Sequence, residues 1–149
     1  MTLEEKINQA IKEAMLARAK ERLEALRSVK SGIILLKTDK GPSHEVTVDE
    51  ELKMLQKQVK QRKESAEIYT QQNRPELAEK ELAEAKIIEE FLPAQMSAEE
   101  LESKIKAIIA QVGAQSAKDM GKVMGVASKE LTGKAEGRAI SDMVKRLLA

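Results

Sequence analysis

The spacing of the apolar residues is the feature that most limits what this 149-residue chain can fold into. Apolar side chains recur at intervals of three and four residues along almost the whole sequence, which is the period of an amphipathic α-helix. The helix formers Ala, Leu, Glu, Lys and Gln dominate, and only seven Gly and three Pro interrupt them. The sequence therefore predicts an all-α protein.

Four helix starts are marked by one local signal, a hydroxyl side chain followed three residues later by a carboxylate. Such a pair satisfies backbone N–H groups that the first turn of a helix leaves unpaired. Each pair precedes a segment with helical apolar periodicity, so we expect helices to begin there. The pairs are Thr2 with Glu5, Thr47 with Glu50, Ser97 with Glu100 and Ser116 with Asp119.

The first part of the chain, residues 1–93, is expected to form an N-terminal domain of long helices. The apolar pattern predicts helices over about 3–14, 23–36, 48–72 and 75–91. Gly41-Pro42 places a loop between the second and third of them. Pro75 suits the first turn of the fourth helix, where a missing N–H costs nothing.

A smaller domain is expected after Pro93. Three shorter amphipathic segments follow this residue, at about 101–112, 120–131 and 140–148. Gly113 and Gly133 mark the ends of the first two segments. Three amphipathic helices of this length can enclose one small core. We therefore predict a compact three-helix bundle over residues 97–149.

Composition limits the kinds of function that are open to the chain. The net charge is +1, so no field of the whole molecule attracts a polyanion, and any nucleic-acid contact must come from a local cluster of cations. One Tyr, one Phe and no Trp leave almost nothing on which splayed bases could stack. The absence of Cys excludes disulfides and sulfur-ligated metals.

No set of residues predicts a catalytic, metal or cofactor site. His44 is the only histidine and lies in a Gly-Pro loop, where we expect it to be exposed and without a function. None of the serines lies in a Gly-x-Ser-x-Gly turn, and no glycine-rich phosphate loop opens a helix. We expect a chain that is not an enzyme on its own and uses no cofactor.

The hydropathy of the chain predicts a cytoplasmic protein without a membrane contact. The opening residues are acidic and amphipathic, unlike the basic start and apolar run of a signal peptide. No apolar stretch approaches the roughly 20 residues that a membrane-spanning helix needs.

The clearest candidate binding surface is a stripe of cations on the predicted helix from Ala117 to Leu131. At about 100° per residue the stripe lies opposite the apolar residues that would face a core. From Ser116 onward seven basic residues stand against four acidic ones, which suits a phosphate backbone. The candidate RNA-binding residues are Lys118, Lys122, Gly125 and Lys129, followed by Lys134 and Arg138.

Gly125 lies in the middle of this stripe. An exposed helix position is more stable with Ala by about 1 kcal/mol, so the glycine suggests that a ligand approaches the backbone closely. The alternative is that Gly121 and Gly125 allow a neighbouring helix to pack tightly. The sequence leaves both interpretations open.

The third predicted helix carries a second basic ridge, which is either a solvated helix face or a further ligand contact. Arg62 falls instead on the apolar stripe of this helix. We expect the Arg62 stem to lie on the core and its guanidinium to pair with Glu81 or Glu84, with ligand contact as the alternative. The ridge consists of Lys53, Lys57, Lys60 and Lys63.

Five short motifs carry a resemblance to a known family. They are Lys60-Gln61-Arg62-Lys63-Glu64-Ser65-Ala66, Arg74-x-x-Leu77-Ala78-x-x-Glu81, Leu92-Pro93-x-Gln95, Asp119-Met120-Gly121-Lys122-Val123-Met124 and Gly133-x-Ala135-x-Gly137. Together they resemble the YqeY-like family, stand-alone relatives of the tail domain of the aspartyl/glutamyl-tRNA amidotransferase B subunit. The chain departs from the family's usual Gly-Arg-Ala-Asp-Gly-Lys, because Lys134 and Arg138 have exchanged places.

The resemblance implies a two-part helical fold and a link to tRNA-dependent amidation, in which the amide nitrogen of glutamine is passed to a misacylated tRNA. This carbon–nitrogen ligase activity belongs to the whole amidotransferase, and the chain resembles only its tRNA-contacting appendage. We therefore expect a non-catalytic RNA-binding module with tRNA as its ligand. The alternative is a protein-interaction module whose long helices dock an amidotransferase or an aminoacyl-tRNA synthetase.

Overall fold

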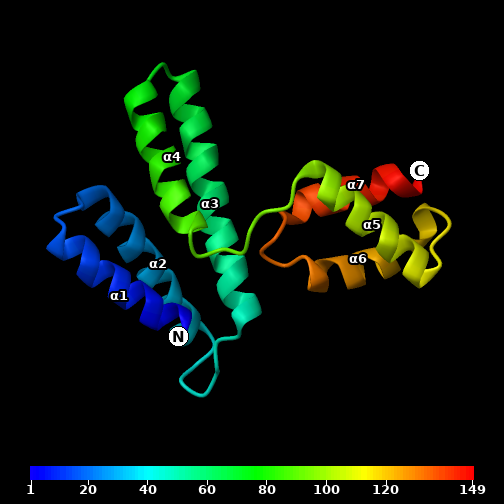
Figure 1. Cartoon of the computed structure of the whole chain (residues 1–149), viewed down its shortest axis with the longest axis horizontal. Coiled ribbons are helices and arrows are strands. Elements are labelled where there is room, and N and C mark those ends of the chain that lie inside the picture. Colours follow the sequence, from blue (N-terminus) through cyan, green and yellow to red (C-terminus); the bar gives the residue numbers. More distant parts are fainter. The chain divides into compact units, whose positions relative to one another are not determined.

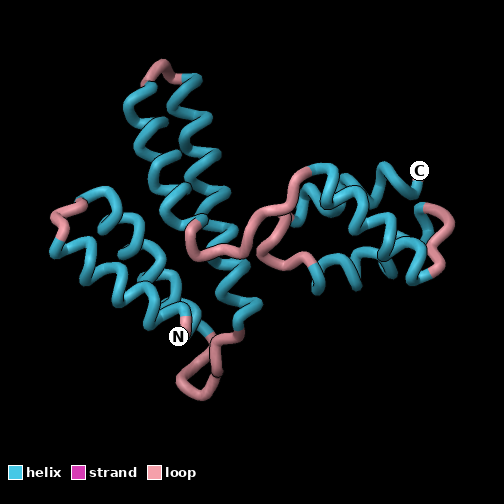
Figure 2. The backbone as a smooth tube through the Cα atoms, viewed as in Figure 1, coloured by secondary structure: helices cyan, strands magenta, loops and turns pink.

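The computed structural model describes residues 1–149 and contains seven α-helices, one 3-10 turn and no strand (Figures 1 and 2). The predicted all-α class is confirmed. The chain divides into two compact units, which we call unit 1 (Met1–Leu92) and unit 2 (Pro93–Ala149). None of the helices combines the length and the apolar character that a membrane crossing requires.

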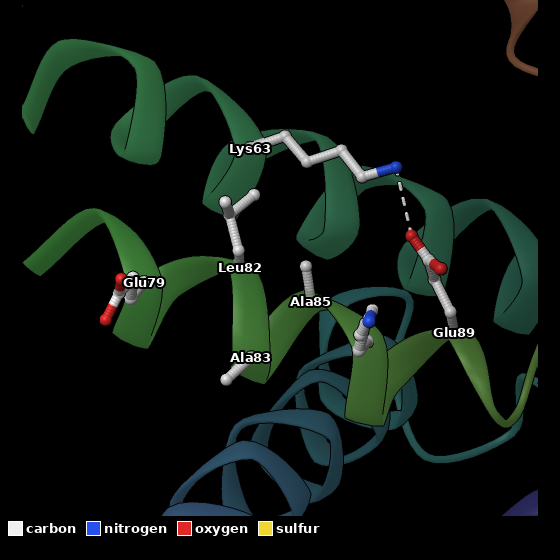
Figure 3. Close-up of a pocket in the computed structure, with 7 residues that line it drawn as sticks. Lys63, Glu79, Leu82, Ala83, Ala85 and Glu89 are labelled. Carbon is white, nitrogen blue, oxygen red and sulfur yellow. Dashed lines mark ion pairs between the residues drawn. The ribbon is translucent and has the colours of Figure 1, made fainter. Parts of the chain in front are cut away.

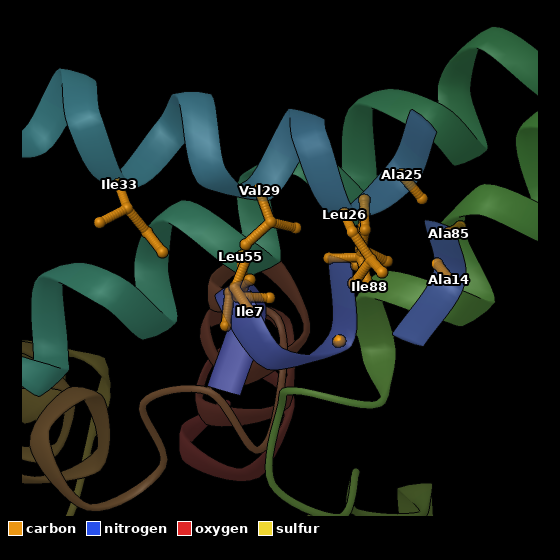
Figure 4. Packing of buried hydrophobic residues seen from close by; sticks show 11 residues of the cluster. Ile7, Ala14, Ala25, Leu26, Val29, Ile33, Leu55, Ala85 and Ile88 are labelled. Atoms are coloured by element: carbon orange, nitrogen blue, oxygen red, sulfur yellow. The ribbon is translucent and has the colours of Figure 1, made fainter. Parts of the chain in front are cut away.

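Unit 1 consists of two helical hairpins around one core (Figures 1 and 4). Each of its four helices contributes a fully buried aliphatic side chain, namely Ile7, Leu26, Leu55 and Ile88 in chain order. Burial of one such side chain stabilises the fold by about 1.5–3 kcal/mol. The helices are α1 (Leu3–Leu16), α2 (Lys20–Asp39), α3 (Val48–Gln71) and α4 (Pro75–Glu89).

The helix starts follow the hydroxyl signal, but not all in the same way. Thr2 and Ser97 form complete capping boxes with the carboxylates three residues later. At Thr47 the hydroxyl accepts the Glu50 N–H at 3.1 Å, yet the Glu50 carboxylate binds elsewhere. His44 Nε2 lies 3.0 Å from both carboxylate oxygens of Glu50.

The prediction of an exposed His44 is wrong. Its side chain is 26% exposed, and it fastens the loop between α2 and α3 to the first turn of α3 through Glu50. Lys40 Nζ lies 3.8 Å from the same carboxylate. The hydrogen bond from His44, assisted by the charges of His44 and Lys40, lowers the pKa of Glu50.

Arg62 joins α3 to α4, and the prediction that it pairs with Glu81 or Glu84 is confirmed. Its Nη1 atom lies 2.9 Å from Glu84 Oε2 and 3.5 Å from Glu81 Oε2. The side chains of Arg62 and Glu84 are only 19% and 8% exposed. Burial raises the pKa of Glu84, and the charge of Arg62 opposes that rise without cancelling it. Arg62 therefore compensates a buried carboxylate.

Unit 2 packs three α-helices and a short 3-10 turn around a core of its own. Ile105, Val123 and Val144, one from each α-helix, are completely buried. Gly113 ends the first of these helices in the left-handed conformation (φ 69°), which a glycine adopts without strain. The elements are α5 (Ala98–Val112), η1 (Ala117–Asp119), α6 (Met120–Glu130) and α7 (Gly137–Leu148).

The helix predicted to start at Ala117 begins as a 3-10 turn, and its α-helical part starts at Met120. The Asp119 N–H donates to Ser116 O at 2.9 Å, a bond over three residues that closes the tighter turn. The Asp119 carboxylate accepts the Gln115 N–H at 2.9 Å, which lowers the pKa of Asp119. These local bonds compete with the α-helical pattern at this end of α6.

Candidate nucleic-acid interface

Helix α6 has one apolar face and one cationic face. Val123 and Ala127 are fully buried in the core of unit 2. Lys122, Gly125 and Lys129 are exposed, and their spacing of three and four residues places them on one side of the helix. The structure therefore brings these three predicted residues together.

The other predicted cations of unit 2 lie on neighbouring elements. Lys118 is exposed on η1, so the predicted stripe is not on one continuous α-helix. Lys134 is exposed in the loop after α6, and Arg138 is exposed in the first turn of α7. We refer to Lys118, Lys122, Lys129, Lys134 and Arg138 as the unit 2 cations.

The loop that carries Lys134 is fixed by the segment that enters unit 2. Gln95 Nε2 donates to Gly133 O at 2.6 Å, and the Met96 N–H donates to Lys134 O at 3.0 Å. Gly133 has a φ of 79°, a conformation that favours glycine. Sequence reasoning assigned no role to Gln95, because its partner lies 38 residues away.

None of the unit 2 cations takes part in a salt bridge. Two other cations of the same unit do form ion pairs with carboxylates. Lys104 Nζ lies 3.1 Å from Glu130, and Arg146 Nη2 lies 3.2 Å from Glu102. The unit 2 cations therefore have no carboxylate within salt-bridge distance, although Lys122 lies near enough to Asp119 to help lower the pKa of that carboxyl.

The starts of α6 and α7 differ from the starts of the other capped helices. Helices α1, α3 and α5 have two or three acidic residues in their first turns, which stabilise the positive end of the helix. Helices α6 and α7 carry Lys122 and Arg138 in their first turns, and the carboxylates at their starts belong to the N-cap residues Asp119 and Glu136. The positive ends of these two helices are therefore balanced by one carboxylate each.

The glycines of α6 have no neighbour. A Cβ atom added at Gly121 or Gly125 would meet no heavy atom within 4 Å. The interpretation that these glycines allow a neighbouring helix of the chain to pack tightly is therefore wrong. The other interpretation, that a ligand approaches the backbone at Gly125, stays a prediction.

The second basic ridge on α3 is partly engaged in ion pairs. Lys53 Nζ lies 3.1 Å from Asp49 one turn away. Lys63 reaches across to Glu89 of α4 at 3.0 Å, along a hollow whose walls include Leu82 and Ala85 (Figure 3). Lys57 and Lys60 are exposed. At Lys53 and Lys63 the structure favours a solvated helix face.

No three His, Cys, Asp or Glu side chains are grouped so that they could hold a metal ion. The fold and the site define an all-helical protein with a group of exposed cations on its C-terminal unit that form no salt bridge. A family model described as Yqey-like protein matches residues 4–148. The chain therefore belongs to the YqeY-like family, and the predicted resemblance is confirmed. The search of curated proteins found no match.

Proposed function

We propose that the protein is a non-catalytic RNA-binding module and that unit 2 carries the contact surface, with tRNA as the ligand. The observation that carries the proposal is the group of exposed unit 2 cations without salt bridges, next to glycines that nothing covers. Cations that neutralise phosphates release the counterions that are condensed on the RNA, and this release drives binding. The resemblance to the tRNA-contacting amidotransferase tail supports tRNA as the class of RNA.

The proposed contact is with the outside of a folded RNA. The chain has one Tyr, one Phe and no Trp, so it lacks stacking platforms for unpaired bases. Lysines bind phosphates as point charges, and the guanidinium of Arg138 can bind one phosphate through two donors. Selectivity would then come from the shape of the RNA. In the cell we expect an accessory role in the cytoplasm, related to tRNA-dependent amidation.

The test is fluorescence anisotropy of labelled bulk tRNA with the purified full chain at low and at physiological salt. We expect micromolar affinity that falls steeply with salt, and loss of binding when Lys118, Lys122 and Lys129 are all replaced by Glu. The matched control replaces Lys6, Lys12 and Lys20, three exposed cations of unit 1, by Glu.

The control makes the same change in net charge, so it separates a local contact from a general loss of attraction. Helicity is expected to stay unchanged in both variants. Unaltered tRNA binding by the unit 2 variant, or equal loss in both variants, contradicts the proposal.

A second candidate role is favoured by a different observation. All large hydrophobic side chains that are strongly exposed lie in unit 1, and unit 2 has none. Exposed apolar side chains that form a continuous patch mark protein contacts, and Met15 with Leu16 and Ile34 with Leu35 are neighbours in the chain. We therefore also propose that unit 1 docks a protein, such as an amidotransferase or an aminoacyl-tRNA synthetase. The exposed side chains are Met1, Met15, Leu16, Ile34, Leu35, Val48, Ile68 and Leu82.

The docking role is tested by titrating the labelled chain with each purified candidate enzyme at low and high salt. Binding that persists at high salt, without RNA, supports apolar docking. Binding that requires added tRNA, or no binding, contradicts it.

A further inference from the structure

The end of α2 carries more apolar residues than its core contact uses. Residues 33–36 are Ile-Ile-Leu-Leu, yet only Ile33 is buried, with 2% of its surface exposed. Ile34 and Leu35 are 49% and 66% exposed, and Leu36 is half-buried. A run of apolar residues on the outside of a helix is unfavourable unless a partner covers it.

Leu35 and Leu36 border a hollow of about 480 Å³ between α2 and α3, which we call the α2–α3 groove. Gly32 and Met54 also line it. A Cβ atom added at Gly32 would lie 2.7 Å from Met54 Sδ, so the glycine permits the close approach of the two helices.

Gln58 joins the two helices that form the groove. Its Nε2 donates to Ser28 O at 3.1 Å, and its Oε1 accepts the Ser28 hydroxyl at 3.3 Å. These two hydrogen bonds tie α3 to α2 directly beside the lining residues. The groove is therefore formed before any partner arrives, which lowers the entropy cost of binding.

The two walls of the α2–α3 groove differ in character. The α2 wall presents Leu35 and Leu36, whereas the α3 wall presents Lys53 and Lys57, one turn apart. Lys57 has no salt bridge, and Lys53 has only an exposed pair with Asp49, which a new partner can replace at little cost.

Two carboxylates and three lysines line the groove. Glu50 is bound by His44 and lies within ion-pair distance of Lys40. Asp39, at the end of α2, is the other carboxylate. Apart from the pair of Glu50 with Lys40, the two lysines Lys53 and Lys57 outnumber Asp39, so the α3 wall favours a negatively charged partner.

We infer that the α2–α3 groove is the docking site for an amphipathic helix of a partner protein whose polar edge is acidic. The inference rests on the second proposed role, docking by unit 1, and does not depend on RNA binding. Apolar side chains at a helical spacing of three and four residues would lie on Leu35 and Leu36. Glu or Asp on the flank would face Lys53 and Lys57.

The probe is a fluorescein-labelled synthetic helix with Leu along one face and Glu along one edge, titrated with the full chain at physiological salt. We expect saturable binding that is weakened about tenfold by Leu35→Ser and by Lys57→Glu. Lys12→Glu is the matched control for the change in charge and is expected to leave peptide binding unchanged, because Lys12 is exposed on α1 and lies outside the groove lining. A second peptide, with Lys in place of each Glu, is expected to bind about tenfold more weakly.

Several results overturn the inference. Failure of the Glu peptide to bind, or equal binding of both peptides, removes the argument from charge complementarity. Peptide binding that is insensitive to Leu35→Ser and Lys57→Glu places the contact elsewhere on unit 1. That result would refute the groove as the docking site and would leave the proposed docking role of unit 1 intact.

Two further measurements separate other occupants. Sedimentation that shows a dimer in the wild type and a monomer in Leu35→Ser assigns the groove to a second copy of the chain. Loss of tRNA binding in Lys57→Glu assigns it to RNA. Either result overturns the inference, and circular dichroism confirms that each variant is folded.

Discussion

The two units use their cations differently. In unit 1 five cations form ion pairs that hold one helix to another, although others, such as Lys6 and Lys12, are exposed without a salt bridge. In unit 2 only Lys104 and Arg146 form ion pairs between helices, and the other cations of η1, α6 and α7 are exposed without a salt bridge. The difference teaches that interhelical ion pairs are a larger part of the assembly of unit 1 than of unit 2. The pairs that join helices of unit 1 are Arg22–Glu90, Lys37–Glu4, Arg62–Glu84, Lys63–Glu89 and Lys80–Glu24.

The largest expected effect is in the buried pair of unit 1. Arg62→Ala leaves Glu84 buried without its cation, so we expect a loss of about 3 kcal/mol in the free energy of unfolding. Hydrogen exchange of the α3 and α4 amides measures this loss, and the amides of unit 2 should keep their protection.

Arg22→Ala is the matched control, because the Arg22–Glu90 pair is 36% and 50% exposed. The Arg22→Ala variant should lose less than about 1 kcal/mol in the free energy of unfolding. Equal losses in both variants would show that burial does not distinguish the two pairs.

The glycines give the next largest effect, with opposite signs in the two units. Gly32→Ala places a Cβ atom 2.7 Å from Met54 Sδ and Gln58 Nε2 and disturbs the bonds of Gln58 to Ser28, so we expect a loss of about 1 kcal/mol. Gly125→Ala meets open space and should raise the free energy of unfolding by about 0.5–1 kcal/mol.

If a ligand approaches the backbone at Gly125, the same substitution should also weaken tRNA binding. Urea unfolding followed by circular dichroism gives the stability, and fluorescence anisotropy gives the affinity. A more stable Gly125→Ala variant that binds tRNA as well as the wild type would refute the close approach.

A smaller effect, on the pH dependence of stability, distinguishes the carboxylates of Glu84 and Glu50 in unit 1. Burial raises the pKa of Glu84, so its contribution to stability is present below its ordinary pKa and is lost as the pH rises through the folded value. The hydrogen bond from His44 lowers the pKa of Glu50, so that contribution is present above the ordinary pKa and is lost as the pH falls through the folded value.

We therefore expect Glu84→Gln to flatten the stability profile above the ordinary carboxyl pKa. His44→Ala should flatten it below that value. The measurement is urea unfolding of each variant between about pH 3 and pH 7. Parallel profiles for the wild type and both variants would contradict these assignments.

The smallest expected effects on stability come from single exposed lysines. Lys63→Ala removes a surface pair with Glu89 and should cost about 0.5 kcal/mol or less, with no change in the salt dependence of tRNA binding. Lys129→Ala removes no salt bridge, so stability should not change. The slope of log affinity against log salt should fall by about 1 in this variant alone. A fall in the slope for Lys63→Ala, with no change for Lys129→Ala, would place the RNA contact on unit 1 instead of unit 2.

Local signals in the sequence predicted much of the fold. The capping boxes at Thr2 and Ser97 and the break at Pro75 involve residues within one turn of each other, so they can be read from the chain directly. Arg62 was predictable for the same kind of reason, because a charged residue on an apolar stripe needs a partner on the next helix.

The wrong predictions, at His44 and at the glycines of α6, concern contacts that helical periodicity does not encode. His44 meets Glu50 only because the loop folds back on α3. Whether a helix packs against Gly121 and Gly125 depends on the placement of α5 and α7, which no spacing within α6 reveals. The sequence therefore predicted which cations lie together on α6 but, apart from Arg62, not which cations elsewhere are paired.

The attachment of Gln95 and Met96 to the loop at Gly133 and Lys134 has a mechanical consequence. The hydrogen bonds from Gln95 Nε2 and the Met96 N–H join the entering segment to this loop before the chain reaches α5. Tension applied to the chain at Pro93 acts on these bonds before it can unwind α5. These two hydrogen bonds therefore protect the start of α5 from a load on the chain that enters unit 2.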